Sequence, residues 1–520
     1  MTGLKHTVLR LASILLFLLL TACATYEARY FTIQFIDDQT RRGIPLVEIK
    51  STNAVRYVSD SAGWVAMLPG DLAAETLYFT VHSHGYELKE KSSGFHGIQV
   101  KPTAGGRKVI ALRRINIAER LYRITGEGIY HDSRLVGIEP PLPHPEQLSG
   151  GVFGQDSVVN AIYNGQLYWF WGDTRRADGP LGNFEVSGAV SKVPQAGENL
   201  ADDGIHLTYF VNASGFARSM CPIEGIGPVW ISGLMVFEED GKEHMFTHYS
   251  RVEDAQTRLE QGIAVWNDER KIFEKQVEFP LNTPLYPRGQ PLKLRHAGQE
   301  WFYFGRTFPS VRVRAAEQQI LDAKSYEAFT CLTPGSRWRD DAPPLERDGS
   351  GQLVCSWKAD TDLITDERWR TLIENGLVKP EEQRWQLIDI ETGEQITPHN
   401  GSVTWNQHRN RWILIFGQLG GHSLLGEVWY AEAFSPMGPW SAAHKIVTHD
   451  SYSFYNVRQH PYFARGRYLY FEGTYSSWLS GSNDSTPRYN YNQIMYRLNL
   501  DDSRLPRLLK PDSLRNDQDL

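Results

Sequence analysis

The chain has 520 residues, of which 41% are hydrophobic and 22% are charged, and its formal net charge is −7. This length favours roughly two to four domains, or one large β-fold beside a small one. The composition excludes a mostly disordered chain, a collagen-like chain and a protein with many membrane spans. Because the net charge is negative, no broad basic surface for nucleic acid is expected, and nucleic acid is excluded as a partner.

The N-terminal residues indicate an export signal. Lys5 and Arg10 form a basic region, and the apolar run from Leu11 to Leu20 is too short to span a bilayer as a mature helix. The run ends in Leu-Thr-Ala-Cys, which resembles the bacterial lipoprotein signal, in which the cysteine, here Cys23, becomes the lipidated first residue. An ordinary secretory signal with a chance cysteine is the alternative.

The lipoprotein resemblance implies a signal peptide over residues 1–22 and a lipid-anchored tether over residues 23–28. Ala24 follows the cysteine, whereas an aspartate there would resemble a signal for retention in the inner membrane. The sequence therefore favours the outer membrane of a Gram-negative bacterium. We expect the lipid on Cys23 to be the only contact with the membrane and to tether a soluble body to its surface.

Short alternating strands separated by turn residues predict a small β-sandwich over residues 29–114. The expected strands lie at residues 30–35, 46–49, 77–81 and 108–112. The stretches at 42–47, 59–63 and 84–86 resemble the carboxypeptidase regulatory-like sandwich, which is an accessory or spacer module. Residues 115–150 contain a short helix-like piece and a proline-rich stretch, and we interpret them as a linker.

Three cysteines lie beyond the signal, at Cys221, Cys331 and Cys355. An exported location permits disulfides. Cys331 and Cys355 are a candidate pair that leaves one thiol over, and buried free cysteines are an equally consistent interpretation. No spacing typical of a zinc site is present.

Residues 151–500 contain an internal repeat. Four copies consist of a turn, an aromatic strand and a glycine seven residues after the turn. The turns end at Gly165, Gly298, Asn410 and Gly466, and the glycines are Gly172, Gly305, Gly417 and Gly473. A fifth, degenerate copy begins at 240–241. A single hairpin cannot bury its own face, so five such units predict an all-β fold, a five-bladed β-propeller.

A large β-sandwich or jelly roll is the alternative to the propeller. Helices are expected only locally, around residues 315–321 and 366–374, and residues 501–520 are expected to form a polar C-terminal tail.

The Asn164-Gly165 turn is typical of a two-residue type I′ hairpin and fixes the register of its strands. Asp156 and Asp173 lie eight residues from this turn on either side. They are therefore expected to face each other, with Cβ atoms about 5 Å apart. Stability alone would not select this like-charged pair, so we predict a catalytic role. A metal site and a hydrogen-bonded structural pair are the alternatives.

The same offset places residues of other hairpins in the same region. Arg306 and Gln418 occupy the position of Asp173 in their hairpins, and Glu472 lies two residues earlier in its own. The two-residue period of a strand puts Glu472 on the same face. These strands are expected to lie nearest the propeller axis and to line one funnel.

Glu472 is predicted to be a third catalytic carboxylate. If residues 465–466 form the turn of this hairpin, Glu472 pairs with Gln459. The next residue, His460, is predicted to bind substrate. Three carboxylates beside an arginine are consistent with a glycosidase site. A buried salt bridge between Glu472 and Arg306 is the alternative.

Two stretches around the paired aspartates, residues 154–157 and 168–174, look like the first blade of the five-bladed propeller glycoside hydrolases. The resemblance is closest to the endo-D-arabinanase-type family, which has an aspartate before its first strand and Gly-Asp-Thr after its second. Both aspartates are functional in that family, and they correspond to Asp156 and Asp173. Residues 426–440 resemble a blade strand and Gly-Pro-Trp turn of arabinanase and xylosidase propellers.

Further residues are predicted to contact substrate or to line the site. Trp230 could stack on a sugar ring, with core packing as the alternative, and His422 lies in a glycine-rich loop. Gln155 and Arg175 flank the two aspartates. No metal site or cofactor is predicted, with a structural calcium ion at the propeller centre left open.

These observations together predict a lipid-anchored, monomeric glycoside hydrolase acting on an extracellular polysaccharide. One carboxyl group would protonate the leaving oxygen, and another would attack the anomeric carbon or activate water. A non-catalytic sugar-binding propeller is one alternative. A polysaccharide lyase with His460 or Tyr455 as its base is the other.

Overall fold

The computed structural model of the protein describes residues 29–509 apart from 71–74, 90–95, 142–149, 177–185, 196, 199–203, 255–256 and 483. The signal peptide, Cys23, the end of the expected linker and the last part of the C-terminal tail lie outside the described residues. The chain divides into two compact units, one of residues 1–123 with 128–143 and the other of residues 124–127 with 144–520. Among the described residues, no helix has the length and apolar character needed to cross a membrane.

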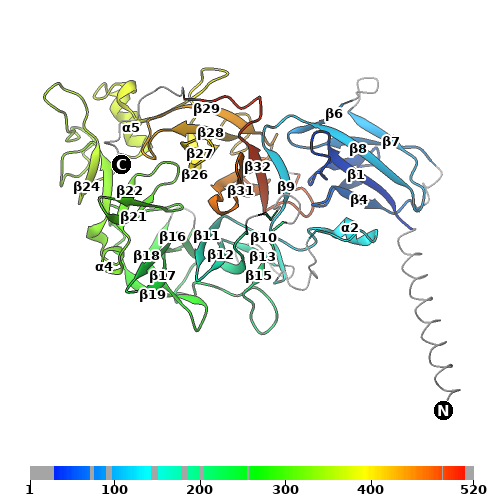
Figure 1. The fold of residues 1–520 in the computed structure, drawn as a ribbon, viewed down its shortest axis with the longest axis horizontal. Coiled ribbons are helices and arrows are strands. Elements are labelled where there is room, and N and C mark those ends of the chain that lie inside the picture. Colours follow the sequence, from blue (N-terminus) through cyan, green and yellow to red (C-terminus); the bar gives the residue numbers. More distant parts are fainter. Residues whose placement is uncertain are drawn as a thin grey trace, which may run out of the picture. The chain divides into compact units, whose positions relative to one another are not determined.

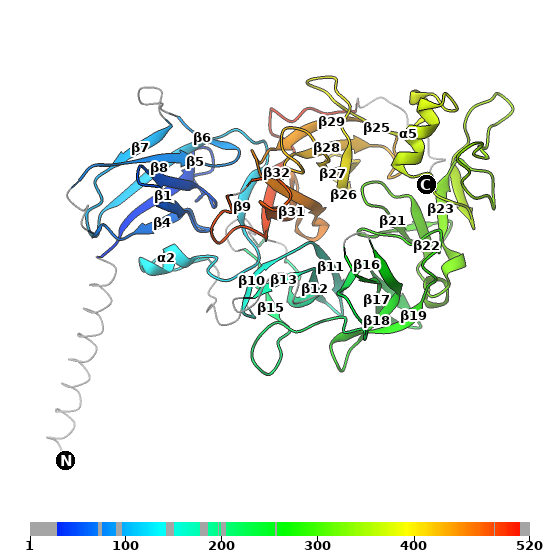
Figure 2. The ribbon, with the colours of Figure 1, turned by 180° about the vertical axis from the view of Figure 1, so that it is seen from behind.

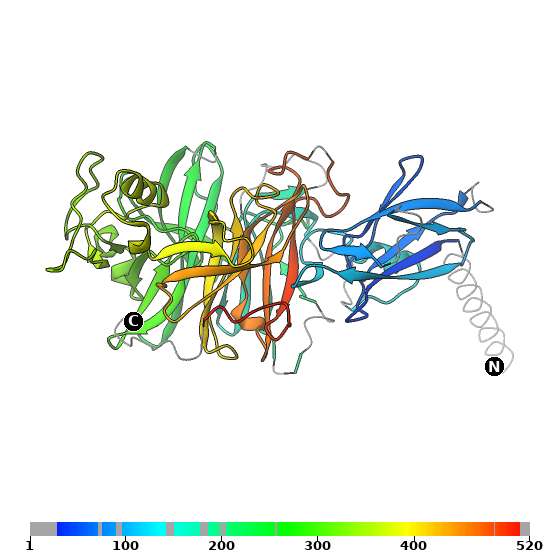
Figure 3. The same cartoon turned by 90° about the horizontal axis from the view of Figure 1, so that it is seen from above.

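The smaller unit contains two four-stranded sheets that share one hydrophobic core (Figures 1 and 3). The first has the order β4 (Trp64–Met67), β1 (Phe31–Asp37), β8 (Arg107–Arg114) and β6 (Tyr86–Leu88). The second has the order β3 (Arg56–Val58), β2 (Glu48–Ser51), β5 (Leu77–His82) and β7 (Gly97–Val100). Ile33 and Ile110 of the first sheet and Ile49 and Phe79 of the second meet in the core, which gives this unit an interior of its own. The residues of β9 (Glu119–Arg123) and α2 (His131–Leu135) also belong to this unit but to neither of these two sheets.

The larger unit contains five successive sheets within its described residues. In spatial order, the first sheet contains β11 (Val158–Tyr163), β12 (Gln166–Trp171), β14 (Ser187–Lys192) and β15 (Thr208–Tyr209), and the second contains β16 (Val229–Glu239), β17 (Lys242–Val252), β18 (Arg258–Asn267) and β19 (Ile272–Glu278). The third contains β20 (Leu292–His296), β21 (Gln299–Phe304), β22 (Val311–Arg314), β23 (Glu327–Thr330) and β24 (Ser356–Ala359), and the fourth contains β26 (Pro398–Asn406), β27 (Arg411–Gln418), β28 (Val428–Ala433), β29 (Trp440–Val447) and β25 (Trp385–Asp389). This unit's strands of the fifth sheet are β30 (Ser453–Gln459), β31 (Tyr468–Ser476) and β32 (Asn492–Asn499).

The five sheets follow one another in chain order around the middle of the larger unit (Figure 2). Within each sheet, strands that are consecutive in the chain pair antiparallel, while β25 runs parallel to β29. Separate hydrophobic clusters lie between successive sheets. Phe170 packs with Trp266 of the next sheet, for example, and Phe246 with Phe304 of the one after. Each sheet thus buries its faces against its neighbours, because a hairpin alone cannot.

The predicted register of the first hairpin is confirmed. Pairing runs from Tyr163–Gln166 to Val158–Trp171, and both turn residues have positive φ, 47° at Asn164 and 73° at Gly165. The same register resumes beyond a short irregularity, in the pair of β10 (Val152–Gln155) and β13 (Thr174–Arg176). Asp156 and Asp173 lie in this irregular step.

The register predicted for the last hairpin is wrong by one residue. The backbone closes a two-residue turn at 466–467 rather than at 465–466, and the 3-10 helix η5 (Pro461–Phe463) follows β30. As a result Glu472 lies opposite Arg458 and not opposite Gln459. Proline has no N–H to donate to a ladder, so strand pairing stops at this point and the helix resets the register.

The two local helices occur close to where they were expected, as α4 (Glu317–Ile320) and α5 (Asp366–Glu374). The Thr365 side chain accepts a bond from the backbone of Arg368 and caps α5. Two further short 3-10 helices are η3 (Ala323–Ser325) and η4 (Pro380–Glu382).

The candidate disulfide is present. Cys331 and Cys355 are joined, and Cys331 packs with Trp369 and Leu372 of α5. Cys221 is buried in a separate cluster between the first two sheets. The disulfide therefore ties the long loop before β24 to the core beneath α5.

Candidate active site

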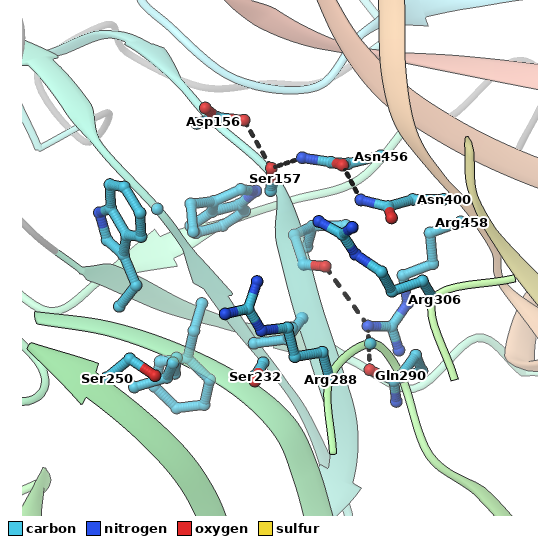
Figure 4. Close-up of a pocket in the computed structure, with 18 of the residues that line it drawn as sticks. Asp156, Ser157, Ser232, Ser250, Arg288, Gln290, Arg306, Asn400, Asn456 and Arg458 are labelled. Atoms are coloured by element: carbon cyan, nitrogen blue, oxygen red, sulfur yellow. Dashed lines mark hydrogen bonds between the residues drawn. The ribbon is translucent and has the colours of Figure 1, made fainter. Parts of the chain in front are cut away.

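One cavity of about 330 Å³ receives residues from all five sheets of the larger unit or from the segments that adjoin them (Figure 4). Its polar and aromatic lining includes Asp156, Ser157, Asp173, Trp230, Ser232, Arg288, Gln290, Arg306, Asn400, Asn456 and Arg458. Concave sites with a few convergent polar groups are where ligands usually bind. Of the site residues predicted from the sequence, Asp156, Asp173, Trp230 and Arg306 line this cavity.

Asp156 accepts hydrogen bonds from four hydroxyl groups. Tyr455 and Tyr491 donate to Oδ2 at 3.1 and 3.0 Å, while Ser157 and Thr474 donate to Oδ1 at 2.5 and 3.2 Å. A carboxylate has lone pairs for all four donors, whereas a protonated acid would need one oxygen to donate. The surroundings of Asp156 therefore fit the ionised form.

Asp156 is also the end of a hydrogen-bond chain across the cavity wall (Figure 4). The Asn400 amide donates to Asn456, the Asn456 amide donates to Ser157, and Ser157 donates to Asp156. Asn456 holds a φ of 54°, in the left-handed region that asparagine tolerates better than most residues. Three sheets therefore fix the position of one carboxylate.

Asp173 lies in a different environment on the partner strand. The backbone N–H of Asp156 donates to the carbonyl of Asp173 at 3.0 Å, and the Trp230 indole donates to Asp173 Oδ1 at 3.0 Å. Burial raises the pKa of Asp173 to about 6; the bond from Trp230 opposes this shift and the charge of Asp156 adds to it. Asp173 thus holds a proton more readily than an ordinary aspartate does, as a general acid must.

Glu472 and His460 do not converge with these residues, contrary to the prediction. Both are fully buried, with Glu472 Oε1 3.1 Å from His460 Nε2, and neither lines the cavity. The predicted alternative, a salt bridge to Arg306, is not formed either. Because of the one-residue shift of the β30–β31 register, Glu472 lies opposite Arg458 rather than Gln459, and its carboxyl group is buried against His460.

The buried pair belongs to a polar network beneath the cavity. His460 Nδ1 lies 3.2 Å from the Asn160 amide, and Arg458 donates to both oxygens of Asn160, at 2.8 and 2.6 Å, and to Gln290. Burial lowers the pKa of His460, although Glu472 opposes this shift. The network therefore positions Arg458, whose side chain forms part of the cavity wall.

Gln155 and Gln418 also lie outside the cavity. Gln155 is fully buried, where it donates to Ser187 and accepts a bond from Tyr209. Gln418 accepts a bond from the Trp429 indole at 2.9 Å. Both amides are held by protein groups and support the fold rather than the cavity.

Arg175 and His422 do not line the cavity either. The Arg175 guanidinium lies 5.2 Å from the centre of the Tyr491 ring, so it supports one of the groups that hold Asp156. The His422 side chain is 72% exposed and lies 3.6 Å from Asp450. Within the described residues, no three His, Cys, Asp or Glu side chains gather closely enough to hold a metal ion.

Several cavity residues were missed, although the sequence contained a usable pattern. Asp156 lies eight residues before its turn, and the same position in three other hairpins is Ser232, Gly289 and Gly401, all of which line the cavity. Applying the offset to both sides of each turn would have pointed to the segments that hold Arg288 and Asn400. In the last hairpin the same offset, counted back from residue 465, gives Val457, which also lines the cavity and neighbours Asn456.

No protein-family profile matches this chain, and no curated protein sequence does. Solved structures with a similar backbone include a Bacteroides ovatus protein, at 12% identity and a TM-score of 0.41, over 67% of this chain and 87% of that one. Others are a GH43_1 enzyme from Xanthomonas citri complexed with xylotriose (12%, TM-score 0.32, 69% and 88%) and an exo-β-1,3-galactanase from Phanerochaete chrysosporium with β-1,3-galactotriose (8%, TM-score 0.35, 73% and 64%). At these identities and TM-scores the likenesses assign neither activity nor substrate to this chain.

Proposed function

We propose that the larger unit is a five-bladed β-propeller that hydrolyses glycosidic bonds of an extracellular polysaccharide, and that the cavity is its active site. The observation that carries this proposal is the pair Asp156 and Asp173. They lie opposite each other on one hairpin, in a cavity shared by five sheets, in environments that favour different protonation states. Stability does not select such a pair, whereas glycoside hydrolysis requires one.

Asp173 is the proton donor in this proposal. Its raised pKa keeps a fraction of the group protonated near neutral pH, so its O–H can pass a proton to the glycosidic oxygen as the bond to the anomeric carbon breaks. Asp156 is the carboxylate that attacks the anomeric carbon or takes a proton from the attacking water. Trp230 orients Asp173 through its indole N–H and offers an aromatic face to the sugar.

The lyase alternative is less favoured by the described geometry. Tyr455 would have to act as a phenolate base, yet burial and the charge of Asp156 raise its pKa well above the ordinary value, and its hydroxyl already donates to Asp156. His460, the other base considered, is buried beside Glu472 and outside the cavity. Neither group is placed to abstract a proton from a substrate.

A panel of polysaccharides tests the proposal through its products. New reducing ends without an unsaturated sugar indicate hydrolysis, and their loss in Asp173→Asn assigns the products to this cavity. Unsaturated products, which absorb ultraviolet light, would instead show a lyase. Binding without any product would identify the non-catalytic alternative.

Asp173 should also make stability depend on pH. Its pKa is higher in the folded state, so ionisation costs no stability below about pH 4 and an increasing amount as the pH rises through about 6. Asp173→Asn should therefore raise the free energy of unfolding at pH 8 by about 2 kcal/mol and change it little at pH 4. Urea unfolding at both values checks this. An equal change in the free energy of unfolding at pH 4 and pH 8 would contradict the raised pKa of Asp173.

We further propose that the protein is a monomeric lipoprotein of a Gram-negative outer membrane, with the smaller unit as a β-sandwich accessory module. The lipoprotein signal that ends at Cys23 supports the anchor. Mass spectrometry of the mature N-terminus should show an acylated Cys23. Recovery of an unmodified peptide that runs through residues 18–28 would contradict this, and Cys23→Ser should release the protein from membranes.

A further inference from the structure

The side chains of two arginines of the cavity form no hydrogen bond or ion pair among the described residues. Arg288 precedes β20 and Arg306 follows β21, and both side chains are exposed to the cavity. Figure 4 shows them reaching into the same space, with no hydrogen bond drawn from either. Their guanidinium N–H groups are therefore open to a ligand.

The other two arginines of the cavity are already occupied. Arg458 is buried and donates to Asn160 and Gln290. Arg258 donates to Gln261 and lies 4.9 Å from the centre of the Tyr286 ring. Their donors are used to hold the cavity wall.

Arg288 and Arg306 bring two positive charges close together in the cavity. Desolvation in the cavity lowers the pKa of Arg288, and the charges of Arg258 and Arg306 add to this shift. The charge of Arg306 counteracts the effect of burial on the pKa of Asp366, but the two side chains form no ion pair among the described residues. The side chains of Arg288 and Arg306 thus form a positive patch in the cavity that no ion pair neutralises among the described residues. An anion from outside would relieve the repulsion.

The two aspartates do not supply this anion. Asp156 is saturated by four hydroxyl donors, and Asp173 is held by Trp230. Neither forms an ion pair with Arg288 or Arg306 in the described structure. The cavity thus has an acid–base side formed by the aspartates and a cationic side formed by the two arginines.

We propose that the substrate is an acidic glycan, and that Arg288 and Arg306 bind a carboxylate or sulfate group on the sugar beside the bond to be cleaved. Guanidinium groups match both oxyanions through paired N–H bonds. This inference rests on the proposed function for the cleavage step, but the binding of an acidic sugar stands apart from it. The arginines act by binding and orienting the sugar, while the aspartates carry out the chemistry.

Binding and cleavage are tested separately. Asp173→Asn is titrated by calorimetry with oligosaccharides from polygalacturonate and alginate, which carry carboxylates, from carrageenan, which carries sulfates, and from neutral xylan and arabinan. We expect oligosaccharides of one acidic class to bind. Whether they carry carboxylates or sulfates then shows which group the two arginines recognise. Arg288→Gln or Arg306→Gln in this background should weaken binding by about tenfold to a hundredfold, and the binding should weaken with added salt.

Arg295→Gln is the matched control, because this arginine lies on β20 with an exposed side chain and does not line the cavity. It should leave binding unchanged. In the otherwise unaltered enzyme, the two cavity variants should raise KM for the acidic polymer more than they lower kcat.

The outcomes distinguish the two proposals. Acidic oligosaccharides that bind through both arginines but are never cleaved would uphold this inference and overturn the hydrolase. Cleavage of a neutral polysaccharide, with KM unaltered in the arginine variants, would uphold the hydrolase and overturn this inference. Absence of binding to every acidic oligosaccharide would overturn the inference outright.

Discussion

Replacement of either Asp156 or Asp173 by asparagine should lower kcat/KM for the cleaved polysaccharide by about 10²- to 10⁴-fold. The reason is that each variant removes one half of the acid–base pair, while asparagine keeps the size of the side chain and one oxygen acceptor. For Asp173, that oxygen can still accept the Trp230 bond. Initial rates of reducing-end release measure the effect.

The double variant should be little worse than either single one, because groups that act in one step fail together. Asp450→Asn is the matched control, since this carboxylate is 55% exposed beside His422 and lies outside the cavity. Circular dichroism should show that the two single variants, the double variant and the Asp450→Asn control are all folded. Full activity in either single variant would leave the hairpin register intact and refute the catalytic role.

The second large effect is expected at Glu472, and it concerns stability. Glu472→Gln removes the negative charge that faces His460 and Arg458 in the core, so Arg458 is left buried without an opposing charge. Leaving a buried charge without a compensating one costs about 3 kcal/mol or more of the free energy of unfolding. Denaturant unfolding measures this loss.

Kinetics of the same variant separate this structural role from the one expected from the sequence. If Glu472 were the proton donor, an aryl glycoside with a good leaving group would restore much of its rate. We expect no such selective rescue, since Glu472 does not line the cavity. Glu300→Gln, an exposed carboxylate on β21, should alter stability by less than about 0.5 kcal/mol and serves as the control.

The sequence predicted well those features that are set by local geometry. The Asn164-Gly165 turn has two residues, so it fixed the pairing of its strands and placed Asp156 opposite Asp173. The helix at 366–374 was likewise predicted from local pattern, and Thr365 supplies its cap. Such features depend on neighbours in the chain and need no knowledge of distant contacts.

Features that depend on distant contacts were not predicted. Gln418 occupies the same offset as Asp173, but Trp429 holds its side chain outside the cavity. Glu472 was paired with the wrong residue because the 3-10 helix at Pro461–Phe463 shifts the β30–β31 register by one residue. Arg288 lies in a segment between sheets, where neither periodicity nor turn chemistry indicates direction.

The four hydroxyl groups around Asp156 have a consequence for the way the larger unit holds together. Tyr455, Thr474 and Tyr491 come from the last sheet or the segment leading into it, whereas Asp156 belongs to the first. The backbone of Gln155 also donates to the carbonyl of Tyr491. Hydrogen bonds therefore join the first and the last sheet of the larger unit at Asp156, the carboxylate proposed to take part in catalysis. Under the proposed function, activity should therefore depend on these hydrogen bonds between the first and the last sheet. If they broke while the sheets stayed folded, the protein should lose activity, and a ligand bound to Asp156 should stabilise the contact between the two sheets.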